Sequence, residues 1–247
     1  MHVKEAFKAY VSDYDLSDVK VKLKADHTYR VAAMCDAITE DLGLSAVDRD
    51  LAWLSGMLHD IGRFEQLRQY HTFQDRVSCN HAMLSADILF RDGKIRLFVR
   101  DGEEDTLALL EKTIRLHNVY RLPEDLSERE YRFATILRDA DKIDILRVNC
   151  DTPLEDIYNV TTEELKKAAV SEEVKKGFVE RHTVLRSLKH TPVDNLVGHI
   201  CLVFELVYPV STQIAKEQGY VDKLLQFASD NPDTNAWIAY MREHVWG

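Results

Sequence analysis

Residues 56–66, GMLHDIGRFEQ, place His59 directly beside Asp60 at the end of an apolar run. Side chains at adjacent positions of a helix point in different directions, so a regular helix cannot present both groups to one partner. If the helix instead ends near residue 60, the imidazole and the carboxylate can both reach the same point. The stretch therefore predicts a helix that stops at a buried polar site.

The segments around this stretch have helical periodicity. Leu51, Leu54 and Leu58 recur at three- and four-residue steps within residues 48–61. Residues 27–38, 78–90, 106–120 and 130–146 show the same spacing, and Ser78 is expected to cap the second of these segments. The candidate strand KIRLFV, residues 94–99, is too short to define a sheet. We therefore predict an all-α fold.

No long linker, low-complexity tract or internal repeat divides the 247 residues. We expect a single all-α domain over residues 1–247, with a helical core of about residues 20–150 and C-terminal helices over about residues 151–247. The apolar stretch 193–210 is interrupted by Asp194, His199 and Glu205, which favours a buried helix over a membrane span. Pro209 is expected to end or kink a helix.

The composition is typical of a globular protein, with 45% hydrophobic and 30% charged residues. Acidic residues outnumber basic ones by 42 to 32, and the resulting net charge of −10 argues against binding to duplex nucleic acid. The four cysteines stand far apart, and the N-terminal residues carry charges in place of an apolar signal segment. We expect reduced thiols and a cytoplasmic protein that does not enter a membrane.

Each of the five apolar helix faces contains or adjoins a group that can bind a metal. A single buried histidine is usually a satisfied core residue, but an ionisable group is costly to bury unless it is paired or coordinated. Helical bundles build metal sites from inward side chains on facing helices. Imidazole and carboxylate ligands suit iron, manganese or zinc. The candidate ligands are His27, His59, Asp60, His81, His117 and Asp141.

The order His27, His59–Asp60, Asp141 resembles the H…HD…D signature of the HD superfamily of metal-dependent phosphohydrolases. The pair stands inside LHDIGR and the last aspartate inside DADKID, and the resemblance covers about residues 20–150. It implies an all-α helical bundle around a buried metal centre, with these four residues on one divalent ion and the remaining helices as a C-terminal extension.

Some branches of the superfamily add two histidines between the HD pair and the last aspartate, and hold a second metal. His81 and His117 occupy this interval. The resemblance therefore implies two divalent ions bridged by Asp60, with iron, manganese or zinc favoured over magnesium. The alternative is a single ion, with both histidines contacting a phosphate of the substrate.

The resemblance implies hydrolysis of a phosphate ester or anhydride by a metal-activated hydroxide, with Asp60 and Arg63 as catalytic residues. Arg63 stands where many relatives carry lysine, and it is expected to bind a phosphate oxygen. The alternative is a surface arginine that caps the C-terminus of the helix ending at the HD pair. The candidates for substrate contacts are Arg63, His71, Arg76 and Lys142. An exposed loop position for His71 and an ion pair of Lys142 with Asp139 or Asp144 are the alternatives.

The expected partner is a small phosphorylated molecule, such as a nucleotide, a dinucleoside polyphosphate or another phosphorylated metabolite. Two other functions compete with this hypothesis. A small branch of the superfamily uses the same six ligands around a mixed-valent di-iron centre to oxidise organic substrates with dioxygen. A non-catalytic, metal-binding regulatory protein is the second alternative. The sequence indicates no oligomeric state.

Overall fold

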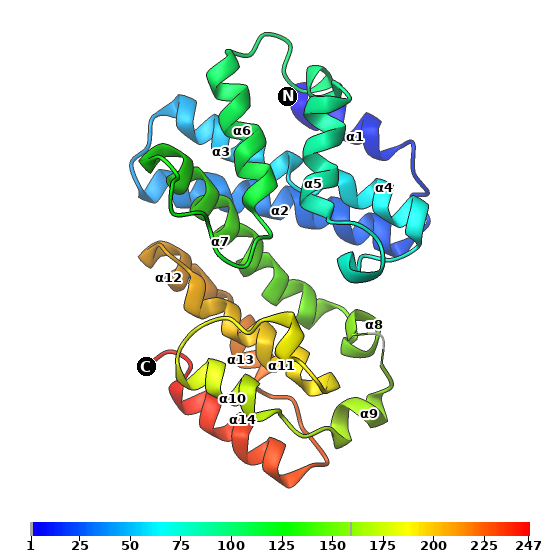
Figure 1. Cartoon of the computed structure of the whole chain (residues 1–247), viewed down its shortest axis with the longest axis vertical. Helices are drawn as coiled ribbons and strands as arrows, with labels where there is room; N and C mark the ends of the chain where they lie inside the picture. Colours follow the sequence, from blue (N-terminus) through cyan, green and yellow to red (C-terminus); the bar gives the residue numbers. More distant parts are fainter. Residues whose placement is uncertain (1, 159) are drawn as a thin grey trace. The chain divides into compact units, whose positions relative to one another are not determined.

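The structure, a computed structural model, describes residues 2–158 and 160–247. Over these residues the chain is helical and contains no strand, which confirms the predicted all-α fold (Figure 1). The chain forms two compact units, residues 1–141 and 142–247. The expected single domain, with a core of about residues 20–150, stays a prediction.

The first unit contains six α-helices and the first part of a seventh, which continues into the second unit without a break (Figure 1). They are α1 (His2–Val11), α2 (Val19–Asp41), α3 (Ala46–Leu58), α4 (Ile61–Tyr70), α5 (His81–Ala86), α6 (Glu104–Leu116) and α7 (Glu128–Asp151). Short 3-10 helices lie at η1 (Asp75–Val77) and η3 (Lys94–Leu97), and a π-helical segment, η2 (Asp87–Arg91), follows α5. The strand candidate at residues 94–99 therefore includes a 3-10 helix.

The expected cap of the α5 segment is wrong. Asn80 caps α5, and its side chain accepts hydrogen bonds from the backbone N–H groups of Ala82 (3.0 Å) and Met83 (3.2 Å). The hydroxyl of Ser78 instead donates to the carbonyl of Gln74 in the preceding turn. Asparagine is as good an N-cap as serine, so a serine two residues upstream does not start the helix.

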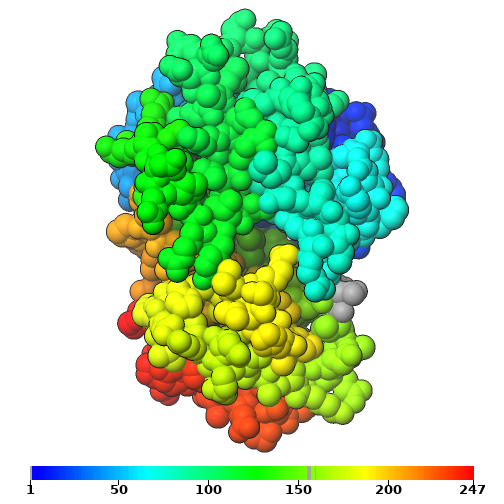
Figure 2. All heavy atoms as spheres, viewed as in Figure 1, coloured from blue at the N-terminus to red at the C-terminus, as the bar shows by residue number. Residues whose placement is uncertain are grey.

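Two glycines allow the helices of the first unit to approach closely. α2 packs along α3, α4 packs against α5, and α5 packs against α6. A Cβ at Gly56 of α3 would lie 2.6 Å from Cα of Ala32, and a Cβ at Gly62 of α4 would lie 2.6 Å from the backbone nitrogen of Ser85. On the face shown in Figure 2, the surface of this unit comes mostly from segments after residue 60 (cyan to green).

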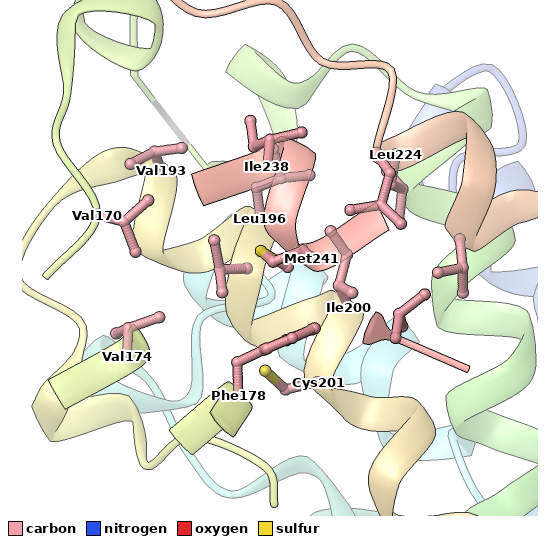
Figure 3. Close-up of a cluster of buried hydrophobic side chains, with 14 of the residues drawn as sticks. Val170, Val174, Phe178, Val193, Leu196, Ile200, Cys201, Leu224, Ile238 and Met241 are labelled. Atoms are coloured by element: carbon pink, nitrogen blue, oxygen red, sulfur yellow. The ribbon is translucent and has the colours of Figure 1, made fainter. Parts of the chain in front are cut away.

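The second unit has its own apolar core, in which α10 (Glu172–Val179), α11 (Pro192–Ile200) and α14 (Pro232–His244) contribute Phe178, Leu196 and Met241 (Figure 3). Its other helices are α8 (Leu154–Tyr158), α9 (Thr162–Lys167), η4 (Arg186–Leu188), η5 (Cys201–Glu205), α12 (Pro209–Gln218) and α13 (Tyr220–Leu224).

The stretch 193–210 forms most of α11, then η5, and then the start of α12. Pro209 is the first residue of α12, so the expectation that it ends or kinks a helix is wrong. The first position of a helix needs no backbone N–H, and proline fits there without strain. None of the helices that the structure describes is long and apolar enough to cross a bilayer.

Candidate metal centre

The interruption between α3 and α4 confirms that a helix stops at the His59–Asp60 pair. α3 ends at Leu58 with His59 as its C-cap, and Asp60 is the N-cap of α4 with φ −106° and ψ 16°. The break turns the two neighbouring side chains toward the same buried space. The His59 side chain is 0% exposed and the Asp60 side chain is 3% exposed. In a continuous helix these adjacent side chains would point in different directions, whereas the break lets both face one site.

The other candidate ligands come from four further helices of the first unit. His27 lies within α2, His81 is the first residue of α5, and His117 is the C-cap of α6. Asp141 lies on α7. The six candidate ligands thus come together from positions spread over more than a hundred residues of sequence.

The ligand atoms form two groups that share Asp60. His27, His59 and Asp60 each offer an atom within 4.8 Å of the others, and so do Asp60, His81 and His117. Oδ2 of Asp60 lies 3.6 Å from Nε2 of both His27 and His59. Oδ1 lies 3.6 Å from Nε2 of His81 and 3.8 Å from Nε2 of His117. One carboxylate therefore presents a different oxygen to each group.

Asp141 adjoins the first group only. Its Oδ1 lies 3.2 Å from Nε2 of His27 and 3.8 Å from Nε2 of His59. Burial opposes ionisation of the Asp141 carboxyl, but the hydrogen bond from His27 outweighs it and holds the pKa of this carboxyl well below the usual range. Asp141 therefore lies where it could supply a fourth donor atom to an ion held by His27, His59 and Asp60.

The hydrogen bonds of three histidines leave their Nε2 atoms as lone-pair donors. Nδ1 of His59 lies 2.8 Å from the carbonyl of Gly56, and Nδ1 of His117 lies 2.8 Å from the carbonyl of Ile114. Nδ1 of His81 lies 2.6 Å from Oδ2 of Asp75. Because each acceptor can only receive a proton, each Nδ1 carries the hydrogen and each Nε2 carries a lone pair.

These lone pairs meet without a donor between them. Nε2 of His81 and Nε2 of His117 lie only 3.0 Å apart. Among the described residues, the buried Nε2 of His59 and Oδ1 of Asp60 have no hydrogen-bond partner. Buried acceptors that face one another are unfavourable unless a cation lies among them. The donor set therefore fits divalent metal ions that prefer nitrogen and oxygen ligands.

The charge states also favour metal binding. Burial lowers the pKa of His81 and of His117 to about 4, so both rings are neutral near pH 7. Burial opposes ionisation of Asp60, but the charges of Lys24 and Arg63 outweigh it, and its pKa lies well below the usual range. Neutral imidazoles and an ionised carboxylate are the forms that bind metals.

Sequence reasoning missed two residues that contact this site. Nζ of Lys24 lies 2.8 Å from Oδ2 of Asp60, and Asp75 accepts from His81 as described above. Lys24 precedes His27 by three residues on α2, so helical spacing could have placed it on the same face. Asp75 lies in η1, outside any long helix, and no periodic signal marks it.

Arg63 lies beside the ligands, but it is held by the protein. Its Nη1 donates to Oε1 of Gln66 (2.8 Å), the carbonyl of Phe73 (2.7 Å) and Oδ1 of Asp75 (2.9 Å). Its Nε lies 3.7 Å from Oδ1 of Asp60, and its side chain is 14% exposed. Its side chain is largely buried and donates to residues that follow the HD pair, not to the last carbonyls of α3, so it is neither a surface residue nor a cap of that helix. Its role in binding phosphate stays a prediction.

The other residues predicted to contact a substrate lie at the end of α4, in η1 and at the start of the second unit. His71 is the exposed C-cap of α4 in the left-handed conformation, with φ 56°, and Arg76 is exposed in η1. Lys142 is the first residue of the second unit; it is buried and its Nζ lies 3.4 Å from Oε2 of Glu205. Contacts of these residues with a substrate stay predictions.

Residues 25–146 match the family model described as the HD domain, and this segment contains all six candidate ligands. A search of curated proteins and a search of solved structures found no match. HD domains bind divalent metal ions and are typical of metal-dependent hydrolases. The match and the clustered ligands thus agree on the same part of the chain.

Proposed function

We propose, from the premise that this chain belongs to the HD-domain family, that it is a metal-dependent phosphohydrolase with two divalent ions. Its substrate is a phosphate ester or anhydride of a small molecule, such as a nucleotide or a related phosphorylated metabolite. Iron, manganese or zinc matches the ligand chemistry better than magnesium, since four of the six ligands are imidazoles.

The observation that carries the proposal is the position of Asp60 between the two ligand groups. Its Oδ2 faces His27 and His59, and its Oδ1 faces His81 and His117. A site for one ion needs only one such group, whereas a shared carboxylate with an oxygen toward each group is the arrangement expected for a pair of ions. Paired ions are a recurrent solution for phosphoryl transfer.

When bound, divalent ions polarise the phosphoryl group and make water a stronger acid near neutral pH. The protein restricts the rotation of three ligand rings, because Nδ1 of His59, His117 and His81 each donates a hydrogen bond. The acceptors are the carbonyls of Gly56 and Ile114 and the carboxylate of Asp75, respectively. Burial of the site keeps bulk water away from the histidines. Preorganised, poorly hydrated groups stabilise developing charge better than mobile ones do.

Two cationic side chains support an anionic substrate. Lys24 and Arg63 both lie beside Asp60, with Nζ at 2.8 Å from Oδ2 and Nε at 3.7 Å from Oδ1. Their charges offset the negative charge of the whole chain locally, where a phosphate group would enter. The four cysteines are all free thiols, which supports the proposed cytoplasmic location.

Metal analysis and phosphate release test the proposal together. Protein purified without chelator is expected to hold about two ions per chain and to release phosphate from at least one member of a panel of nucleotides, dinucleoside polyphosphates and sugar phosphates. Asp60→Asn should abolish release, whereas His190→Ala, at an exposed histidine outside the ligand groups, should retain it.

Two results would contradict the proposal. Metal content near zero after incubation with iron, manganese or zinc would remove the metal centre. Consumption of dioxygen coupled to loss of an organic substrate, with no phosphate released, would identify an oxygenase instead.

A further inference from the structure

The three histidines with defined Nδ1 hydrogen bonds obtain their acceptors in two different ways. His59 and His117 are the C-caps of α3 and α6, and each donates to the carbonyl three residues earlier in its own helix. The last carbonyls of a helix have no intrahelical partner, so they are ready acceptors. The acceptor and the ligand therefore belong to one local structure.

His81 cannot use this solution, because it is the first residue of α5. The residues immediately before it, 78–80, are not helical, so its own helix has no earlier turn to supply a carbonyl. Its acceptor is Oδ2 of Asp75, a side chain six residues earlier in η1, at 2.6 Å from Nδ1. A carboxylate is the only acceptor in the three pairs that carries a charge, and charge-assisted hydrogen bonds are shorter and stronger than neutral ones.

The Asp75 carboxylate is itself held on both oxygens. Oδ1 accepts from Nη1 of Arg63 at 2.9 Å and from Nε2 of Gln66 at 3.0 Å. Nδ2 of Asn118, next to His117, lies 3.4 Å from Oδ2. The donors come from α4 and from the end of α6, so the carboxylate is fixed relative to the helices that carry the other ligands.

We propose that Asp75 is a positioning residue of the metal centre, which keeps the His81 proton on Nδ1 and directs the Nε2 lone pair toward the second ion. The alternative proton position would be harmful. With the hydrogen on Nε2, His81 would donate to Nε2 of His117 across the 3.0 Å gap, and two ligand nitrogens would be lost at once. The role in metal binding rests on the proposed two-ion function, whereas the control of the tautomer does not.

Outer partners of metal-binding histidines typically change metal affinity by about 10- to 100-fold when they are removed. We therefore expect Asp75→Leu to weaken binding of the second ion by about this factor and to leave the first ion in place. Asp75→Asn keeps an oxygen acceptor without the charge, so it should preserve the tautomer and weaken the second ion less.

The tautomer is tested on metal-free protein with ¹⁵N-labelled histidine, by NMR at about pH 8, where neutral imidazole predominates. In the wild type, the ring proton of His81 should be on Nδ1. In Asp75→Leu, His81 should change to protonation on Nε2, whereas His59 and His117 keep their protons on Nδ1 and so report that the fold is intact. A wild-type His81 protonated on Nε2 would overturn the proposal, and so would a tautomer unchanged in Asp75→Leu.

Titration with Mn²⁺ or Zn²⁺, followed by calorimetry, measures the second effect. The control is Asp87→Leu, which removes a carboxylate of similar exposure, 27% against 21%, that pairs with Arg91 and Arg115 and touches no ligand. Equal affinity of Asp75→Leu and the wild type for the second ion would overturn the role in metal binding. A wild type that binds no second ion would contradict the proposed function, and the His81 tautomer would still decide whether Asp75 positions the ring.

Discussion

Gly62→Ala should destabilise the protein, although alanine is the better helix former. Gly62 lies in the first turn of α4, and its backbone N–H donates to Oγ of Ser85 at 2.9 Å. An added Cβ would lie 2.6 Å from the backbone nitrogen of Ser85, 2.9 Å from its Oγ and 3.0 Å from the carbonyl oxygen of His81. Backbone atoms cannot move aside alone, so α4 and α5 must separate.

The expected change in the free energy of unfolding combines one stabilising effect with two destabilising ones. Alanine gains about 1 kcal/mol of helix propensity over glycine, and less in a first turn. Overpacking costs about 1–3 kcal/mol, and a weakened hydrogen bond to Ser85 costs about 1 kcal/mol more. The expected net loss is about 1–3 kcal/mol, which for a chain of this size lowers Tm by about 3–10 °C.

Thermal unfolding in the presence of a chelator is the appropriate assay, because bound metal would add its own stabilisation. Gly198→Ala is the matched control: Gly198 lies within α11, and the atoms nearest its added Cβ belong to the flexible end of Lys189. This control should be neutral or stabilised by up to about 1 kcal/mol. A Gly62→Ala protein as stable as the wild type would refute the argument that close approach of α4 and α5 requires this glycine.

Three further predictions concern the ligands and their supports. His117→Ala should lower bound metal from about two ions per chain to about one, and His59→Ala should remove the ion of the other group; elemental analysis that finds no change for either variant would contradict the two-group site. Burial lowers the pKa of His81 and His117 to about 4 in the folded protein, whereas histidine in an unfolded chain has a pKa of about 6.5. Between these two pH values the unfolded state binds more protons than the folded state does. The free energy of unfolding of metal-free protein should therefore fall as the pH drops from about 6.5 to about 4, and urea unfolding that is constant over this range would disagree. Arg138→Met should cost about 3 kcal/mol, measured by chemical denaturation, because the buried guanidinium donates to three carbonyls around the end of α6; a loss below about 1 kcal/mol would contradict this role.

The helices of the first unit could be predicted because their signals are local. Apolar residues at three- and four-residue steps mark the inward faces of α2, α3, α6 and α7, and burial of such a stripe is what stabilises an amphipathic helix. The two wrong predictions also concerned local features, namely the cap of one helix and the position of a proline in another. Asn80 competed with Ser78 for the cap of α5, and Pro209 occupies a helix position that tolerates it.

The order of His27, the HD pair and Asp141 determined by itself which family the chain resembles and which residues could bind metal. Only the tertiary structure decided that each oxygen of Asp60 faces a different ligand group, that Lys24 lies 2.8 Å from one of them, and that Asp75 holds His81. Spacing along one helix specifies a face, but a distance between side chains on different helices depends on how closely those helices pack and which rotamers remain free. Those quantities arise from contacts between residues far apart in sequence, and periodicity does not encode them.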